Sequence, residues 1–242
     1  MKLQIIDSGS HGNAYLLKAE TTRESLLIEC GVKIQQIKKA LGFNLRDVSC
    51  IVSHSHNDHS SAMEDLLKAG VNVYAGKETH QAKGTDKHHR AYNIFPGFTY
   101  VIGGFKIKPF AVNHDVPTLG FLINHVESGL VLFLTDTFFT DYKFPGLNNI
   151  IIECNHDLQI VAANERPRFL QERVAFSHMN LDTCRTMLQA NDLTQVNNVV
   201  LIHLSDSGSN AAGFKKDIAA ATGKPVTVAE PGLIIQFDKT PF

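Results

Sequence analysis

Long apolar runs and an excess of charge of one sign are both missing from this sequence of 242 residues. No segment approaches the length of a membrane-spanning helix. The first residues, MKLQIIDSGS, enter a strand-like pattern without the apolar region of a signal peptide. Lys and Arg total 23 against 24 Asp and Glu, which excludes the overall basicity of a non-specific nucleic-acid binder but not a local basic patch. We therefore expect a cytoplasmic protein that does not enter a membrane.

Cysteine is scarce, and its spacing is uninformative for metal binding. Cys30, Cys50, Cys154 and Cys184 lack CxxC spacing, so we expect buried thiols in a reducing cytosol rather than a cysteine metal site. The chain also has no low-complexity tract, long charge run or Pro/Ser-rich hinge. Residues 1–242 are therefore predicted to form one globular domain.

Strand-like and helix-like segments alternate in both halves of the chain, with a strand-rich stretch between them. Residues 98–112 contain a Gly-Gly turn, and residues 118–135 have the pattern of a hairpin that turns at 127–129. Helices are predicted at 32–42 (VKIQQIKKALG), 61–70 (SAMEDLLKAG), 181–191 (LDTCRTMLQAN) and 210–223 (NAAGFKKDIAAATG). An α/β (α+β) fold of two face-to-face sheets with helices outside would fit this order, although periodicity alone does not separate it from other α/β layouts.

SHSHNDHS, residues 53–60, follows the apolar run CIV and contains the pattern His54-x-His56-x-Asp58-His59. In an extended segment residues i and i+2 point the same way, so His54 and His56 can reach one ion together. Asp58 and His59 lie past the end of the strand and can address a second ion. Imidazole nitrogen and carboxylate oxygen are ligands that zinc prefers, so the pattern predicts a metal site. The alternative interpretation of this segment is a solvated polar loop.

Three residues at other predicted strand ends complete a candidate metal site. His114 comes after KPFAV, Asp136 after VLFLT and His203 after NVVLI. Active sites of layered α/β proteins collect at the C-terminal ends of strands. Each residue taken alone could equally cap a helix or hydrogen-bond within a loop. Ser61 and Glu64 have capping-box spacing, so a helix is predicted to begin at Ser61 and to point its N-terminus toward the site.

HxHxDH followed by His, Asp and His at later strand ends resembles the metallo-β-lactamase superfamily, whose fold is an αββα sandwich. Seven segments look closest to its YycJ-like subgroup of DNA exonucleases and related phosphodiesterases: SGSHGNAYLL, SLLIECG, CIVSHSHNDHSSAM, FAVNHD, IIIECNHD, FSHMN and VLIHLSD. The resemblance implies that one metal is held by His54, His56 and His114, that a second is held by Asp58, His59 and His203, and that Asp136 bridges the two.

At two positions the residue type in this chain differs from that found in members of the family. Glu29, in LLIECG, stands where the family usually has an aspartate that supports the ligands, so its contact is expected to differ. Flavodiiron relatives have a glutamate at the position of His56, which disfavours a redox di-iron role for this chain.

The resemblance implies a hydrolase that uses two divalent cations, Zn²⁺ or Mn²⁺. Such a pair would lower the pKa of a bridging water and clamp the attacking and leaving oxygens of a phosphodiester. We therefore expect a nuclease that trims DNA or RNA ends, with Asp58 and His178 as catalytic residues. The alternatives are a small-molecule hydrolase acting on a lactone, thioester, β-lactam or cyclic phosphodiester, and a metal-binding module without turnover. Nothing in the sequence indicates an oligomeric state.

The resemblance places His178, in FSHMN, close to the metals but outside their ligands. It precedes a helix that Asn180 or Asp182 could cap. An imidazole there could assist the leaving group or grip the scissile phosphate, and Glu153 or His156 could orient its ring. The alternative is a hydrogen-bonded loop residue without a catalytic role.

Two further segments allow two interpretations each. The glycines of SGSHGN, residues 8–13, let the backbone approach a ligand closely or form a plain hairpin turn. Lys83, Lys87 and Arg90 surround a polar loop and could contact a polyanion or simply be solvated.

Overall fold

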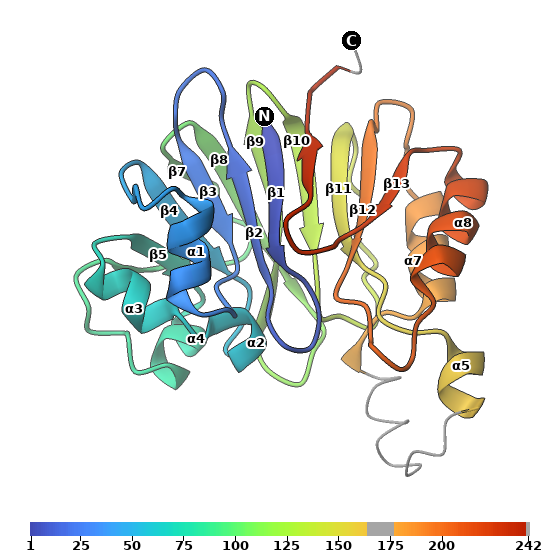
Figure 1. The fold of residues 1–242 in the computed structure, drawn as a ribbon, viewed down its shortest axis with the longest axis horizontal. Helices are drawn as coiled ribbons and strands as arrows, with labels where there is room; N and C mark the ends of the chain where they lie inside the picture. Colours follow the sequence, from blue (N-terminus) through green and yellow to red (C-terminus); the bar gives the residue numbers. More distant parts are fainter. Residues whose placement is uncertain (164–176, 241–242) are drawn as a thin grey trace.

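Two seven-stranded sheets lie face to face in the computed structural model, which describes residues 1–163 and 177–240 (Figure 1). Sheet A consists, in spatial order, of β14 (Ile234–Gln236), β1 (Lys2–Asp7), β2 (Ala14–Lys18), β3 (Ser25–Ile28), β4 (Val48–Val52), β5 (Asn72–Ala75) and β6 (Ala91–Asn93). Sheet B consists of β13 (Val226–Val228), β12 (Asn198–Ile202), β11 (Leu147–Glu153), β10 (Gly129–Leu134), β9 (Thr118–His125), β8 (Phe105–Val112) and β7 (Tyr100–Ile102).

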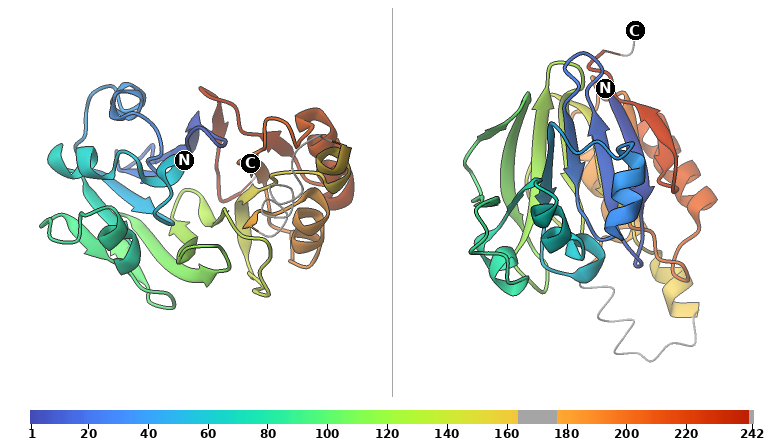
Figure 2. Two further views of the ribbon diagram at one scale, coloured as in Figure 1. Left: turned by 90° about the horizontal axis from the view of Figure 1, so that it is seen from below. Right: turned by 60° about the vertical axis from the view of Figure 1, so that its left-hand side comes forward.

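Helices flank the two sheets on their outer sides (Figures 1 and 2). On the side of sheet A lie α1 (Ile34–Ala40), α2 (Asn57–Ser60), α3 (Met63–Lys68) and α4 (Lys77–Ala82). On the side of sheet B lie α5 (Leu158–Ala163), α7 (Leu181–Gln189) and α8 (Ala211–Thr222). This arrangement confirms the predicted αββα sandwich. None of the helices in the described ranges is long and apolar enough to cross a membrane.

The central core fills the space between the two sheets. Leu3 and Tyr15 from sheet A meet Phe121, Phe133 and Ile151 from sheet B, and all five side chains are fully buried. The Tyr15 and Phe133 rings lie 5.7 Å apart between centroids. Because such burial is the main favourable term in folding, this layer holds the two sheets in a fixed relation.

Two further apolar layers fix the helices on the sheets. Leu66 and Leu67 of α3 pack with the outer face of sheet A, and Phe214 of α8 and Met187 of α7 pack with sheet B. All seven residues of β11 are buried, since one of its faces contacts the central core and the other contacts helices.

The direction of the strands brings the segments that contain the predicted ligands to one edge of the sheets. In sheet A, β3, β4, β5 and β6 are parallel. In sheet B, β10, β11, β12 and β13 are parallel, and β8 runs in their direction because it is separated from β10 by antiparallel β9. The segments that follow these strands therefore emerge together, as parallel strands do in α/β proteins.

The predicted helix start at Ser61 is wrong. A single turn, α2, ends at Ser60 with Ser61 as its C-cap, and α3 begins at Met63. Tertiary hydrogen bonds interrupt the helix: the Ala62 N–H donates to the Cys30 carbonyl at 2.9 Å. The capping box and its N-terminus aimed at the site are therefore not formed.

Most other predicted elements are present. The Gly-Gly turn and the hairpin turn at 127–129 join the expected strands, and Asn180 caps α7 by accepting a hydrogen bond from the Thr183 N–H at 2.9 Å. The four cysteines are buried free thiols. Four short elements, α2, α4, β6 and α5, were not predicted.

Candidate metal centre

Four strand ends and one short helical turn place the predicted ligands at the common edge of the sheets. His54 follows β4, and Asp58 and His59 lie on α2. On the opposite sheet, His114, Asp136 and His203 come one or two residues after β8, β10 and β12. The structure thus brings together residues that are up to 149 positions apart (203 − 54).

Backbone conformation turns several of these side chains inward. Asp136 has φ of 45° and His203 has φ of 55°, and Glu29, which directly follows β3, has φ of 64°. A left-handed conformation at a residue other than glycine costs of order 1–3 kcal/mol and persists only where its surroundings enforce it. Three strand ends that meet at one cluster share this conformation, which supports a functional role for the cluster.

The first ligand group consists of His54, His56, His114 and Asp136, whose donor atoms all lie within 4.8 Å of one another. Asp136 Oδ2 is 3.6 Å from His54 Nε2 and 3.5 Å from His114 Nε2. Ser53 Oγ lies 2.8 Å from His54 Nδ1 and fixes the ring so that Nε2 faces Asp136. His54 Nε2 is buried and has no hydrogen-bond partner in the described part of the chain, as expected of an atom that binds a cation.

The second ligand group consists of Asp58, His59 and His203, again within 4.8 Å. Asp58 Oδ2 is 3.3 Å from His59 Nε2 and 3.2 Å from His203 Nε2. The other oxygen of Asp136, Oδ1, lies 3.3 Å from His59 Nε2 and 3.8 Å from His203 Nε2. The carboxylate of Asp136 therefore turns one oxygen to each histidine group.

Glu29 supports the second group from behind. Its buried carboxylate accepts a hydrogen bond from the Ser53 N–H at 3.2 Å and lies 3.7 Å from His59 Nδ1. The extra methylene relative to aspartate thus still places the carboxylate against a ligand histidine. Burial raises the pKa of Glu29, although its contacts with His59 and Ser53 oppose that shift.

His178 lies beside the cluster and is held by Glu153. Glu153 Oε1 is 2.6 Å from His178 Nδ1, while Oε2 accepts hydrogen bonds from the N–H groups of Met179 and Thr137 at 3.2 and 3.3 Å. Asp136, Glu153, His178 and His203 form a third group of donor atoms within 4.8 Å. Of the two candidates for orienting His178, Glu153 makes the contact. Both ring nitrogens of His156 lack a hydrogen-bond partner within residues 1–163 and 177–240.

The loop at residues 8–13 supports the ligand-bearing turn, a role that sequence reasoning missed. The Asn13 backbone N–H donates to the Asp58 carbonyl at 2.7 Å, and its side-chain amide lies 3.3 Å from His59 Nε2. Gly31 packs against the same turn so closely that a Cβ there would lie 1.7 Å from the Asp58 carbonyl oxygen. Asn155 similarly donates to the His203 carbonyl at 2.8 Å. A Gly-Asn pair in a turn was the only sequence signal for the first contact.

The sequence profile described as the Metallo-beta-lactamase superfamily matches residues 7–180. The chain belongs to this superfamily. A ribonuclease Z of Metallosphaera sedula is 28% identical over 132 residues, which cover 48% of this chain and 43% of that relative. The match therefore spans less than half of the relative's length.

Solved structures show the same superfamily fold. The metallo-beta-lactamase fold protein YhfI from Bacillus subtilis has a TM-score of 0.76 at 18% identity and covers 97% of this chain and 98% of its own. A diphosphatase from the PhnP family has a TM-score of 0.67 at 15% identity over 97% of this chain and 96% of its own. The short form of human tRNase Z has a TM-score of 0.64 at 17% identity over 98% and 99%.

The electrostatics of this superfamily site favour cation binding. Burial and the neighbouring His59 hold the pKa of His54 well below its usual range, so His54 is neutral and can act as a ligand. Burial would raise the pKa of Asp136, but the charges of His59 and His203 hold it well below its usual range. Burial opposes the charge on His203, yet Asp136, Asp58 and Glu153 raise its pKa to about 10. A divalent cation binds ionised carboxylates and deprotonated imidazole nitrogens. A histidine that is protonated before the ion arrives must release that proton when the ion binds.

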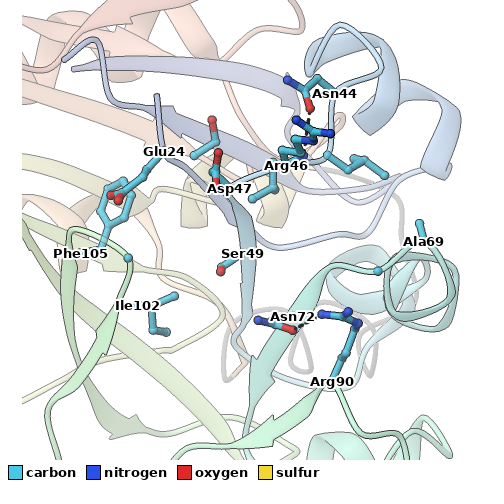
Figure 3. Close-up of a pocket in the computed structure, with 15 residues that line it drawn as sticks. Glu24, Asn44, Arg46, Asp47, Ser49, Ala69, Asn72, Arg90, Ile102 and Phe105 are labelled. Atoms are coloured by element: carbon cyan, nitrogen blue, oxygen red, sulfur yellow. Dashed lines mark hydrogen bonds between the residues drawn. The ribbon is translucent and has the colours of Figure 1, made fainter. Parts of the chain in front are cut away.

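The basic residues of the polar loop are separated by the fold. Lys83 donates to the Asn57 side chain at 2.8 Å, directly beside Asp58. Arg90 instead donates to the Asn72 side chain at 3.0 Å and lines a cavity of about 540 Å³ at the start of β3, β4 and β5, the opposite edge of sheet A (Figure 3). Lys83 therefore lies beside the candidate metal centre, whereas Arg90 lies at the opposite edge of sheet A.

Proposed function

We propose that this chain is a dinuclear metal-dependent phosphodiesterase that cleaves nucleic acid. The observation that carries the proposal is the division of the two Asp136 oxygens between two histidine groups. In this assignment His54, His56 and His114 would hold one Zn²⁺ or Mn²⁺ ion, Asp58, His59 and His203 would hold the other, and Asp136 would contribute to both. Because these residues come from both sheets, we infer that residues 1–242 act as one catalytic domain.

Two bound cations would supply positive charge for the phosphate and a hydroxide nucleophile at neutral pH. The chain's own residues would then handle the protons. His178 is oriented by Glu153, and although burial lowers its pKa, the charge and hydrogen bond of Glu153 raise the pKa above the usual value. This pairing favours the protonated ring, which would donate a proton to the leaving alkoxide. Asp58, held ionised between His59 and His203, can accept a hydrogen bond from the attacking water.

The proposed substrate class is supported by the relatives and by the resemblance to YycJ-like exonucleases. Ribonuclease Z and tRNase Z carry RNA processing in their names, and the third relative is named a diphosphatase. All three names refer to phosphate chemistry. We propose a cytoplasmic location as well, because four free buried thiols suit a reducing compartment.

A small-molecule phosphate hydrolase is the second candidate. The nearly balanced charge of the chain and the fold likeness to a diphosphatase favour it. The same metal-binding residues would serve both activities, so the substrate must be decided by experiment.

The decisive experiment incubates purified protein, loaded with Mn²⁺ or Zn²⁺, with end-labelled DNA and RNA oligonucleotides and, separately, with bis-p-nitrophenyl phosphate. We expect cleavage of the small ester and shortening of at least one oligonucleotide, with both activities lost in His54→Ala. Matched His89→Ala, at an exposed loop position, should keep both. Cleavage of the small ester without any oligonucleotide shortening would support the second candidate, and no cleavage of either would contradict both.

A further inference from the structure

The outer face of sheet B is hollowed at the end away from its helices. A cavity of about 630 Å³ lies over β8 and β9 and is bounded by the chain segment after Asp141. In Figure 1, α7 and α8 lie beside β12 and β13, at the other end of this sheet. The hollow thus lies where the apolar layer that those helices cover continues beyond them.

Aromatic side chains form its floor. The Phe110 ring lies 5.0 Å from Phe144 and 5.5 Å from Tyr142, measured between ring centroids. Gly120 makes this possible, because a Cβ there would lie 2.4 Å from the Phe110 ring. Phe110 thus lies flat on the sheet and is 8% exposed, and Phe144 is 4% exposed, so these two rings support that of Tyr142. Tyr142 keeps 51% of its surface exposed and is the ring open to a ligand.

The charged residues that line the hollow are all positive. Lys108 and Lys143 are both exposed, and the described residues that line the hollow include no Asp or Glu. Neither lysine forms an ion pair with another residue of the described ranges. In a chain whose overall charge is −1, this is a local cationic surface.

Two of the segments that line the hollow are continuous in the chain with candidate ligands. Phe110 lies on β8, whose last residue, Val112, is two positions before His114. Tyr142 and Lys143 lie in the connection from β10 to β11, which also contains Asp136. A polymer seated in the hollow would therefore continue toward the candidate ligands.

We propose that this surface, the aromatic groove formed by Phe110, Tyr142, Phe144, Lys108 and Lys143, binds the single-stranded part of a nucleic acid whose end lies at the metal centre. Base stacking on aromatic rings together with lysine contacts to phosphates is how sequence-tolerant single-strand binding sites are built. Stacking needs unpaired bases, so the groove selects single strands over duplex. This inference rests on the proposed function and narrows its substrate class.

The test measures fluorescence anisotropy of a labelled single strand of roughly 12 nucleotides, with chelator present to prevent cleavage. Tyr142→Ala should weaken binding roughly tenfold, because one stacked base is lost. Lys108→Ala and Lys143→Ala should each reduce the slope of log affinity against log salt by about 0.7. A duplex of the same sequence should bind more weakly than the single strand.

Two matched variants serve as controls. Tyr92→Ala removes a tyrosine that is 43% exposed on the other sheet, and Lys106→Ala removes an exposed lysine of β8 that does not line the groove. Both should bind the strand as tightly as the unaltered protein. All variants should hydrolyse bis-p-nitrophenyl phosphate normally, because that small ester does not reach the groove.

The outcomes separate this inference from the proposed function. Normal hydrolysis of the small ester with no difference between Tyr142→Ala and Tyr92→Ala in strand binding would overturn the groove but leave the phosphodiesterase. Loss of self-association in Tyr142→Ala, measured by light scattering, with unchanged strand binding would show that a second copy of the chain covers this surface and would also overturn the inference.

Discussion

The contact between Glu153 and His178 supports the proposed role of this loop histidine as an acid catalyst. His178 is 20% exposed in its side chain, and its Nδ1 is taken by the buried Glu153 carboxylate, which leaves the other nitrogen for substrate. Carboxylate–imidazole pairs of this kind fix ring orientation and favour the protonated ring. The role of His178 in this account is thus to protonate the leaving oxygen.

His178→Ala should retain its metal content and its melting temperature yet lose roughly two to four decades of turnover on oligonucleotides. Hydrolysis of bis-p-nitrophenyl phosphate should fall much less, since p-nitrophenolate leaves readily without a proton. Steady-state kinetics on both substrates provide the measurement. An equal loss on both would indicate phosphate binding instead of proton transfer, and full activity on both would remove His178 from the site.

The predicted ligand residues could be found in the sequence because their identity and spacing carry the chemistry. Alternate positions on a strand share a face, so the HxHxDH pattern alone placed His54 and His56 together. The residues that support them could not be found in this way. Asn13 and Asn155 act through long-range contacts, and the left-handed conformations of Asp136 and His203 leave no mark on residue type.

At the scale of elements, tertiary contacts overrode a local helix signal. The spacing of Ser61 and Glu64 predicts a capped helix, but the segment is tied to the loop at Gly31 and to Asn13 by backbone hydrogen bonds. The chain therefore forms two short helical segments instead of one. Periodicity predicted α1, α7 and α8 well because their apolar faces alone determine where they pack.

Gly31→Ala should damage the metal centre although it replaces none of the proposed ligands. The added Cβ would lie 1.7 Å from the Asp58 carbonyl oxygen, so the turn that carries Asp58 and His59 must shift. We expect a loss of about 1–3 kcal/mol in the free energy of unfolding and weaker metal binding. Urea unfolding and metal titration measure the two effects.

Gly76→Ala is the matched control, because its Cβ would meet neighbours at 3.7 Å or more. It should leave stability and metal affinity nearly unchanged. Equal effects of the two substitutions would show that close packing of Gly31 on the turn does not hold the ligands in place.

The hairpin turn between β9 and β10 ties the sheets together at the edge opposite the metal centre. Glu127 accepts hydrogen bonds from the N–H groups of Glu20 and Thr21 at 2.9 Å and pairs with the Met1 ammonium at 2.9 Å. Partial burial would raise the pKa of Glu127, but these contacts lower it to about 2. A carboxylate with a depressed pKa stabilises the fold above its unfolded pKa, and this contribution is lost as the pH falls toward the folded value.

Glu127→Gln should therefore destabilise the protein most at about pH 6, and the difference from the unaltered chain should shrink as the pH falls through about 4 toward 2. Urea unfolding with chelator present measures this without a contribution from metal loss. Glu230→Gln, at an exposed position, should show no such dependence. A difference that stays constant across this range would mean that the Glu127 charge does not matter.

For the whole molecule, the αββα layering could be predicted, while the meeting of particular strand ends could not. Alternating strands and helices indicated two sheets with helices outside, and the strand ends were the expected place for a site. Nothing in the order of segments specifies that β4 of one sheet lies opposite β10 and β12 of the other. That relation depends on the central core, where residues such as Tyr15 and Phe133 meet.

The proposed function requires that one carboxylate, Asp136, is shared by two metal ions held by residues of both sheets. Elemental analysis of the purified protein and of Asp136→Ala measures whether it is, with Asp141→Ala, a substitution at an exposed residue of the same connection, as the control. We predict up to two transition-metal ions per chain in the unaltered protein and in the control, and a sharp loss of both ions in Asp136→Ala. Full metal occupancy in Asp136→Ala would contradict the account.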